Sequence, residues 1–536
     1  MTEIHHPSRP LLARLRSESN LLALIGLAIL LIAAGIPRVV ALGRVPLGLN
    51  QDEACNGYDA YSLLQTGRDQ AGNRLPLTIQ AFNDYRMPLF DYSLVPVVGV
   101  FGLDTASVRL GAALWSIADL AALALLGWLM FGMRGSAIAV VLAALSPWHL
   151  PLSRFGHEAI TAAATTSWAM ACFLLWHRRR WSGWLILSAL LFGISLYSYS
   201  ITKLFVPVWL TALAIFYWRD LRRQSITAIA AGALVGLCAI PQMALLWSEG
   251  PRVQARFNEI SIFKSDGWTL DTLWDFFSGL LSHFSPDYLF VHGQQGIRAE
   301  TFHPPGFGQL LWAQAVMVAL ALCAISSPRY RKLILLLLAW LVIAALPVAL
   351  TVPAPHALRN VLAITPWTLL SALGLVFLMD LEVVPAMARQ VAVGLLLIAT
   401  LWQGTSFMRF YFGEYPTVAA RAYQYGMEQV VHAIETYSHD DEPVIITQRM
   451  NQPYIYVLFY RRYPPAEFQS LGVRDNPALF AKVHSFDRYR FQDPGRPLVW
   501  LPHGIFVFSG IERPPETPTL TIRYPDGQIA YQVLAK

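Results

Sequence analysis

Two adjacent carboxylates, Asp52 and Glu53, closely follow the first long apolar segment of the chain. An ionised carboxylate can accept the proton of a substrate hydroxyl group, so the pair is a candidate for general base catalysis. The same residues could instead stabilise the N-terminus of a helix through residues 58–61, where negative charge is favourable. Spacing alone leaves both interpretations open.

Three isolated basic residues, Arg154, Lys203 and Arg359, lie at the ends of apolar segments, on the side where basic residues are otherwise scarce. Arginine binds phosphate through two parallel hydrogen bonds, and lysine offers a point charge. The three residues together therefore predict a site for an anionic ligand at the level of the lipid headgroups, such as a lipid phosphate. The alternative is that each side chain simply extends towards the headgroups.

A short loop segment before Pro88 also carries charge. Asp84 and Arg86 are candidates for contact with a substrate. The alternative is that this segment only anchors the chain at the membrane interface, where tyrosines such as Tyr85 and Tyr92 are enriched.

The loop 282–308 supplies the remaining candidates, His283, Asp287 and Arg298, which we assign to acceptor or substrate binding. Its histidines lack the spacing of metal ligands. The chain has no zinc motif, no phosphate-binding glycine loop and no Gly-x-Ser-x-Gly elbow. We therefore expect no cofactor, and the predicted chemistry requires no metal.

The elements that position these residues are membrane helices. Of 536 residues, 55% are hydrophobic and 14% are charged, whereas soluble domains average about 25% charged. Apolar runs of about 20 residues, long enough to cross a bilayer, recur along the chain. We predict about eleven spans, at 20–42, 107–131, 136–152, 158–176, 182–199, 203–218, 225–247, 309–327, 331–351, 358–380 and 389–408. Residues 90–103 are expected to be interfacial.

The loops between these segments alternate in character. One set is short and basic, including Arg14 and Arg16, residues 177–180 and residues 329–332. The positive-inside rule places this set in the cytoplasm. We thus expect a multi-pass protein of the inner (plasma) membrane, with its N-terminus cytoplasmic and its C-terminus extracytoplasmic. The net charge of +6 is explained by these loops, so nucleic acid is not an expected partner.

The last 128 residues differ from the rest. Residues 409–536 carry 13 basic and 13 acidic residues. Strands are predicted at 443–447, 498–500, 520–524 and 528–534, the last two joined as a hairpin by Pro525-Asp526-Gly527, and a helix is predicted over 418–437. The fold class is therefore mostly α: a polytopic helical bundle over 1–408, with outside loops 43–106 and 248–308, and a small soluble α/β domain over 409–536.

Several of these features occur together in one known group of enzymes. The acidic loop after the first helix, the Ser-Pro-Asp-Tyr-Leu-Phe-x-x-Gly stretch of residues 285–293 and the Ser-Pro-x-x-x-x-x-Ser-Arg element ending at Arg154 resemble the GT-C superfamily of glycosyltransferases. The most similar branch is that of protein O-mannosyltransferases and lipid A aminoarabinose transferases, glycosyltransferase family 39. The resemblance covers about residues 20–410 and implies the GT-C fold.

The resemblance also implies roles for particular residues. Asp52, with Glu53 beside it, matches the family's catalytic base, and residues 85–89 match its second loop element. Arg86 stands where the family often has an acid or a lysine, which leaves the role of Asp84 open. The implied reaction transfers a sugar from a polyprenyl-phosphate donor to a lipid, glycan or protein acceptor, with inversion.

The residues fit that chemistry without the family name. A phosphate leaving group departs as a stable anion and needs no general acid, so one carboxylate base suffices. Arg154, Lys203 and Arg359 could oppose the charge that develops on the phosphate. The expected partners are the donor, an unknown acceptor and membrane lipids. Two alternatives are a transporter (flippase) for lipid-linked sugars, although no repeats are evident, and a non-catalytic membrane scaffold.

Overall fold

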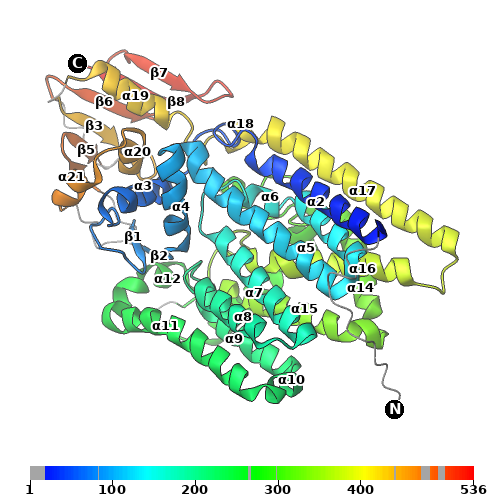
Figure 1. The fold of residues 1–536 in the computed structure, drawn as a ribbon. Helices are drawn as coiled ribbons and strands as arrows, with labels where there is room; N and C mark the ends of the chain where they lie inside the picture. Colours follow the sequence, from blue (N-terminus) through cyan, green and yellow to red (C-terminus); the bar gives the residue numbers. More distant parts are fainter. Residues whose placement is uncertain are drawn as a thin grey trace.

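The computed structural model describes residues 18–536 apart from residue 83 and the segments 264–266, 297–298, 440–441, 473–482 and 493–500. Arg14, Arg16, Arg298 and the strand predicted at 498–500 lie outside the described residues. The described chain forms a long helical bundle with a strand-containing part at one end (Figure 1).

Long apolar helices make up the bundle. They are α2 (Glu18–Val39), α4 (Leu89–Phe101), α5 (Thr105–Ala144), α7 (Ala159–Arg179), α8 (Ser182–Ser195), α9 (Thr202–Phe216), α11 (Ser225–Val253), α14 (Trp312–Cys323), α15 (Pro328–Ala349), α16 (Ile364–Asp380) and α17 (Ala386–Gly413). Short helices lie between them: α6 (His149–Leu152), α10 (Trp218–Arg223), α12 (Ala255–Ile260), α13 (Leu270–Ser282), η1 (Asp287–Val291), η2 (Ala299–Thr301), η3 (Ala324–Ser326), η4 (Val361–Ala363) and α18 (Tyr415–Ala419).

Every predicted span coincides with helix, which confirms the mostly α, multi-pass fold class. Among the described residues, seven helices are long and apolar enough to cross a membrane, and four apolar helices are shorter. The break between the predicted spans 107–131 and 136–152 is present, because α5 is kinked at Gly132, whose φ of 77° is non-helical. The extents of other spans differ from the prediction: the helix after the kink ends at Ala144, and α6 is separate from it. The spans predicted at 182–199, 203–218 and 309–327 contain helices of 14, 15 and 12 residues.

A buried polar cluster joins three of these elements. The carboxylate of Asp119 accepts a hydrogen bond from His149 (Oδ2–Nε2 3.1 Å). The other ring nitrogen of His149 contacts Arg38, which also donates to the carbonyl oxygens of Ala34 and Ala143. Since buried charges require such partners, the cluster fixes α2 and α6 against α5.

The first large loop folds into α3 (Gln51–Thr66) and a two-stranded antiparallel ribbon, β1 (Ile79–Ala81) and β2 (Asp84–Arg86). Asn50 caps α3, because its side chain accepts a hydrogen bond from the backbone of Asp52 while the side chain of Glu53 accepts from the backbone of Asn50. This capping box determines where the helix begins.

The C-terminal part contains one mixed sheet in the order β4-β5-β3-β6-β8-β7. Its strands are β3 (Val444–Thr447), β4 (Ser485–Phe486), β5 (Tyr489–Gln492), β6 (Ile505–Ser509), β7 (Leu520–Arg523) and β8 (Ile529–Ala535), and its helices are α19 (Met427–Tyr437), α20 (Pro453–Tyr460) and α21 (Pro465–Ser470). The strand predicted at 443–447 and the terminal hairpin are confirmed. The single helix predicted over 418–437 is wrong, because α18 and α19 are separated by a turn that ends at Gly426, with φ of 99°.

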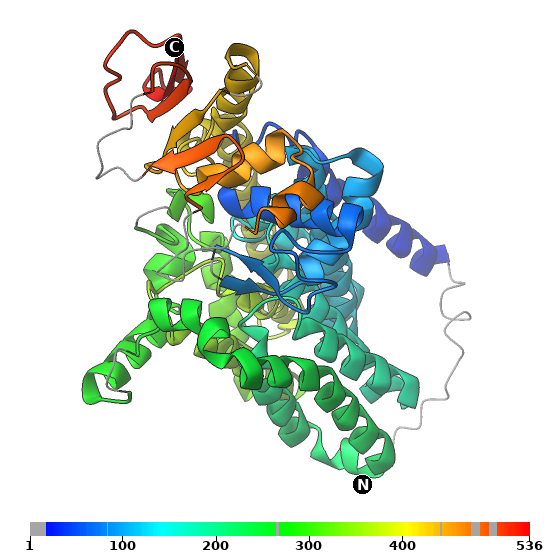
Figure 2. The same cartoon turned by 90° about the vertical axis from the view of Figure 1, so that its left-hand side faces the viewer.

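The strand-containing part packs directly on the first loop. One apolar core includes Tyr58 of α3, Phe90 of α4 and Ile455 of α20. Tyr58 also donates to the carbonyl oxygen of Tyr463. Figure 2 shows the orange and red strands at the end of the bundle, beside the blue α3 region. The predicted domain boundary at residue 408 remains a prediction.

Candidate active site

A cavity of about 1020 Å³ lies where the start of α3, β2 and α9 meet α12, the loop before α16 and the C-terminal strands. Its charged lining residues are Asp52, Arg86, Glu158, Lys203, Arg256, Glu300, Arg359, Arg421 and Arg449, and His157 and His356 also line it. Six basic side chains against three acidic ones favour an anionic ligand, because a cavity lined mostly by one sign of charge attracts the opposite sign.

Asp52 lies in the first turn of α3 and its side chain lines the cavity while half-buried. Burial raises the pKa of this carboxyl group, and the positive groups of Arg86 and Arg256 oppose the rise. A carboxylate with a raised pKa is a stronger base, which suits proton abstraction from a hydroxyl group.

Glu53 is placed differently, although it is the next residue. Its carboxylate is fully buried and paired with Arg109 through two hydrogen bonds, of 2.9 Å and 3.0 Å. It also accepts from the backbone of Asn50 and of Gly156. Glu53 is not among the described residues that line the cavity. The geometry therefore gives it a positioning role, which is to hold the start of α3 against α5 and the loop before α7.

Arg86 reaches the cavity from β2. Its guanidinium group is nearly buried and donates to Asp59 (2.9 Å), to the Cys55 sulfur (3.2 Å) and to the side chain of Asn56. All three partners lie on α3, one and two turns beyond Asp52. Arg86 is thereby fixed beside the candidate base. Asp84, at the other end of β2, pairs with Ala81 through the ribbon.

Lys203 and Arg359 line the same cavity as Asp52, as the sequence predicted. Lys203 is the second residue of α9. Arg359 donates to the hydroxyl of Thr351 (3.1 Å) and to the carbonyl oxygen of Val352 (2.9 Å), which orients its guanidinium group. The structure thus brings together three of the residues chosen from the sequence, one carboxylate and two cations.

Arg154 was predicted to bind phosphate with these two residues, and the structure places it elsewhere. Its guanidinium group is buried and donates to the carbonyl oxygens of Pro37, Ala41 and Val45. The ring of Phe412 covers it at 5.0 Å. Pro37 lies in the last turn of α2, and Ala41 and Val45 lie in the segment that follows it, so Arg154 ties the end of α2 to that segment. Arg154 is not among the described residues that line the cavity.

The candidates of loop 282–308 also lie away from the cavity lining that the structure describes. His283 is buried, bonds the carbonyl oxygen of Gly279 and accepts from the backbone of His356. Asp287 is exposed and pairs with His292 at 2.5 Å. Both therefore shape the loop. Arg298 is outside the described residues.

Two lining residues next to α7 received no role from the sequence. His157 accepts a hydrogen bond from the backbone of Ala159 through Nδ1, and burial lowers its pKa to about 4 although Asp52 opposes the shift. It is therefore neutral near pH 7, with its remaining ring nitrogen as a donor. Glu158 is a second carboxylate in the wall. The sequence signal that could have identified His157 and Glu158 was their position in a short polar loop after Arg154.

Arg421 and Arg449 were not predicted either. Each is tied to a carboxylate behind it, Arg421 to Asp526 at 2.6 Å and Arg449 to Glu512 at 3.3 Å. The two basic groups belong to the cavity lining, whereas their acidic partners do not. No local sequence pattern around Arg421 or Arg449 indicates that their side chains line the same cavity as Asp52.

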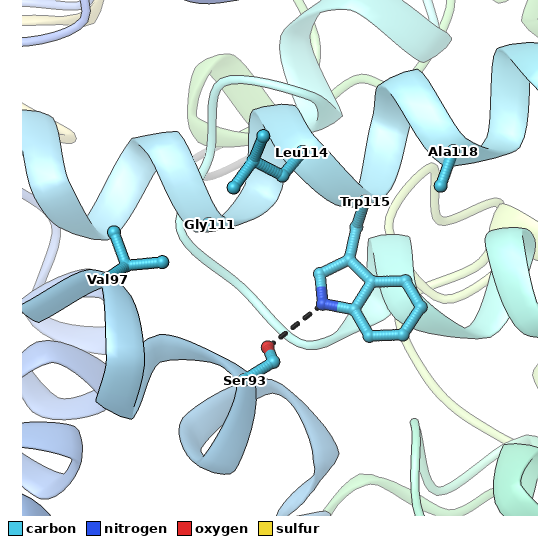
Figure 3. A pocket seen from close by; sticks show the side chains of 6 residues that line it. All are labelled: Ser93, Val97, Gly111, Leu114, Trp115 and Ala118. Atoms are coloured by element: carbon cyan, nitrogen blue, oxygen red, sulfur yellow. Dashed lines mark hydrogen bonds between the residues drawn. The ribbon is translucent and has the colours of Figure 1, made fainter.

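A smaller pocket of about 260 Å³ lies between α4 and α5, as Figure 3 shows. Its lining is apolar except for Ser93, which accepts a hydrogen bond from the Trp115 ring at 2.9 Å. A site without charged groups offers no acid or base, so we do not consider it catalytic. Among the described residues, no group of three or more His, Cys, Asp or Glu side chains could hold a metal ion.

Comparisons with known proteins give two kinds of likeness. Residues 86–247 match the family model described as dolichyl-phosphate-mannose-protein mannosyltransferase. No curated protein sequence matches the chain. Among solved structures, ArnT from Cupriavidus metallidurans bound to undecaprenyl phosphate is 15% identical, with a TM-score of 0.58 over 95% of this chain and 98% of that one.

The second neighbour is an oligosaccharyltransferase from Archaeoglobus fulgidus in its apo form. It is 15% identical, with a TM-score of 0.51 over 81% of this chain and 63% of that one. At such low identity the two structures establish a shared fold. The likeness to ArnT extends over nearly the full length of both chains, so it includes the strand-containing end as well as the helical bundle.

Proposed function

We propose that this chain, whose fold is that of the GT-C glycosyltransferases, transfers a sugar from a polyprenyl-phosphate donor to an acceptor on the extracytoplasmic side of the membrane. The fold and the family match over residues 86–247 support a membrane glycosyltransferase. The observation that carries the finer proposal is that Asp52 shares one cavity with Lys203, Arg359 and Arg86.

In the proposed reaction, an acceptor hydroxyl oxygen attacks carbon 1 of the sugar. The hydroxyl proton passes to the Asp52 carboxylate, and the bond from carbon 1 to the phosphate oxygen breaks with its electron pair on the phosphate. One displacement of this kind inverts the configuration at carbon 1. A positioned base accelerates such a step by about 10²–10⁴-fold.

The basic residues are assigned to the phosphate. Lys203, Arg359 and Arg86 would oppose the negative charge that grows on the leaving group, which is where preorganised positive groups lower the barrier most. Arg256, in α12, lines the same region and pairs with Glu259 at 2.6 Å. Arg154 has no part in this set, because it is not among the described residues that line the cavity.

A lipid donor is supported by the apolar part of the lining. Leu204 of α9, Phe257 of α12 and Leu350 next to α15 line the cavity. Leu204 follows Lys203 in the chain, and Leu350 precedes Thr351, which accepts a hydrogen bond from Arg359. A polyprenyl chain would pack against such residues while its phosphate meets the cations. ArnT, which has the same fold, was solved with undecaprenyl phosphate bound.

We assign acceptor binding to the wall of the cavity that the strand-containing part contributes. Arg421, Arg449 and Tyr531 line the cavity from the strand-containing part. Asn50 donates to the carbonyl oxygen of Ala422 at 3.1 Å, so this wall is attached to the residues that precede Asp52. We therefore propose that the protein lies in the inner membrane. Its C-terminal part is then extracytoplasmic and its N-terminus is cytoplasmic.

The test is mass spectrometry of cell-envelope glycans in a deletion strain complemented with wild type, Asp52→Asn or Asp275→Asn. We expect wild type and Asp275→Asn, whose carboxylate is exposed on α13, to restore the missing product. Asp52→Asn should fail at equal protein abundance. Full restoration by Asp52→Asn would refute the assignment, and accumulation of lipid-linked sugar without any missing product would identify a transporter.

A further inference from the structure

The short helix α13 has three different faces. Its exposed apolar side chains are Leu270, Leu273, Trp274, Phe277 and Leu281. Steps of three, one, three and four residues place all five on one side of a helix with 3.6 residues per turn. Their exposures range from 39% for Leu273 to 85% for Leu270, so no other part of the described protein covers them.

A second stripe of α13 packs on the protein. Thr272 and Gly279 are buried, and Phe276 is half-buried. Gly279 packs on the end of α15, since a Cβ atom built on it would be in ordinary contact with the carbonyl oxygen of Ala349 at 3.4 Å. The side chain of Thr269 accepts from the backbone of Thr272 and caps the helix. The helix is therefore held in one orientation.

The third stripe is polar and exposed. Asp271, Asp275 and Ser278 lie between the buried face and the apolar face on one side. A helix that touches only water would not separate exposed residues into an apolar face and a polar face. This pattern is typical of helices that lie along a lipid-water boundary.

Length and neighbours agree with such a position. Thirteen residues extend for about 20 Å, which is too short to cross a hydrocarbon core of about 30 Å. The apolar helix α11 precedes it, and Trp247 near the end of α11 is 94% exposed. Trp268, just before α13, is also exposed. Exposed tryptophans at the end of a membrane helix mark the interface.

We propose that α13 lies in the plane of the membrane, with its apolar stripe inserted into the outer leaflet and its aspartates facing water. The partner of this surface is the phospholipid bilayer itself. The segment that joins α12 to α13 bonds to the end of α15, through Ile262 to Leu350 and Val352 to Ile260. Insertion of α13 therefore holds the Lys203 and Arg359 side of the cavity at the level of the lipid phosphates.

The test uses spin labels on single cysteines at Trp274→Cys and, as the matched control, Asp275→Cys, in the protein reconstituted into phosphatidylcholine and phosphatidylglycerol vesicles. Cys238 and Cys323 are first replaced by alanine, because they are the two cysteines that are not buried. Collisions with oxygen report lipid exposure, and collisions with a water-soluble nickel chelate report water exposure. We expect label 274 to favour oxygen by several-fold and label 275 to favour nickel.

Equal nickel accessibility at both positions would overturn the proposal, since it places the apolar stripe in water. Protection of label 274 from both reagents would also overturn it, because another protein surface or a second copy would then cover the stripe. A second check needs no cysteine variant and compares the tryptophan fluorescence of wild type with that of Trp274→Phe. The fluorescence that the variant lacks should be the fluorescence that brominated lipids quench in wild type. These outcomes do not depend on the glycosyltransferase activity, which the Asp52 variants test separately.

Discussion

At the scale of single residues, Asp52 and Glu53 show how neighbours in the sequence can have opposite surroundings. The carboxylate of Asp52 lines the cavity, whereas that of Glu53 is enclosed with Arg109. The residue types, together with the predicted side of the membrane, were sufficient to select Asp52, Lys203 and Arg359 from the sequence. They could not show that the Arg154 guanidinium group turns towards the carbonyl groups of Pro37, Ala41 and Val45, because side-chain direction depends on packing that no local pattern encodes.

The contrast between the two carboxylates gives a prediction. Glu53→Gln should destabilise the protein by about 3–5 kcal/mol, because it leaves the buried Arg109 without its counter-charge. Asp52→Asn should leave stability unchanged or higher. The raised pKa of Asp52 means that the folded protein favours the protonated form, so the ionised form costs stability at pH 7 and a neutral amide removes that cost. Thermal unfolding in detergent measures both, and equal loss in both variants would contradict this account.

The same pKa shift predicts the acidic limb of the pH-rate profile. Activity needs ionised Asp52 and should fall as the pH drops through the pKa of its carboxyl group, above the ordinary value of 3.8. The measurement is kcat/KM against pH with saturating acceptor. An acidic limb at or below the ordinary value would show that burial does not control the base.

Arg154 supplies a third prediction at this scale. Arg154→Gln should lower stability by about 1–3 kcal/mol, since it removes the side-chain donor to the carbonyl groups of Pro37 and Val45. The affinity of the folded Arg154→Gln variant for the polyprenyl-phosphate sugar donor should match that of wild type. A selective loss of donor binding with unchanged thermal unfolding would restore Arg154 to the phosphate site.

At the scale of elements, the apolar segments were predictable because a bilayer demands long runs of apolar residues. One interruption was not, since Gly426 adopts a positive φ within the helix predicted over 418–437, whereas Gly132 lies in the gap between the predicted spans 107–131 and 136–152. The position of α3 depends on another glycine. A Cβ atom on Gly57 would lie 2.5 Å from Val108 of α5 and 2.7 Å from Phe459 of α20. This glycine lets α3 fit between the bundle and the C-terminal part.

Gly57→Ala is therefore expected to loosen the packing of α3 against α5 and α20. The added methyl group must displace Val108 or Phe459, and overpacking of this kind costs about 1–3 kcal/mol. Limited proteolysis should cut the variant faster than wild type between residues 413 and 427. As a control, Gly394→Ala adds a methyl group on α17, where no atom lies within 4 Å of the added carbon. Equal resistance of wild type and Gly57→Ala would show that α3 is not tightly held.

At the scale of the whole molecule, the cavity is built by residues from position 50 to position 531. Loop, bundle and strand-containing parts each supply a wall. The sequence predicted the bundle and the outside loops but not the wall formed by Arg421 and Arg449, because a contact across some 370 residues has no local signal. We therefore propose that the donor and the acceptor approach Asp52 from different parts of one continuous cavity.

The division of roles between the base and the cations is tested most directly by binding of the polyprenyl phosphate that leaves the donor. Undecaprenyl phosphate is titrated into purified wild type, Asp52→Asn and the double variant Lys203→Gln with Arg359→Gln. We expect Asp52→Asn to bind as tightly as wild type or more tightly, because a nearby negative charge is removed. The double variant should bind at least about tenfold more weakly, equivalent to about 1.4 kcal/mol. Unchanged binding by the double variant, or loss of binding only in Asp52→Asn, would contradict the proposed site.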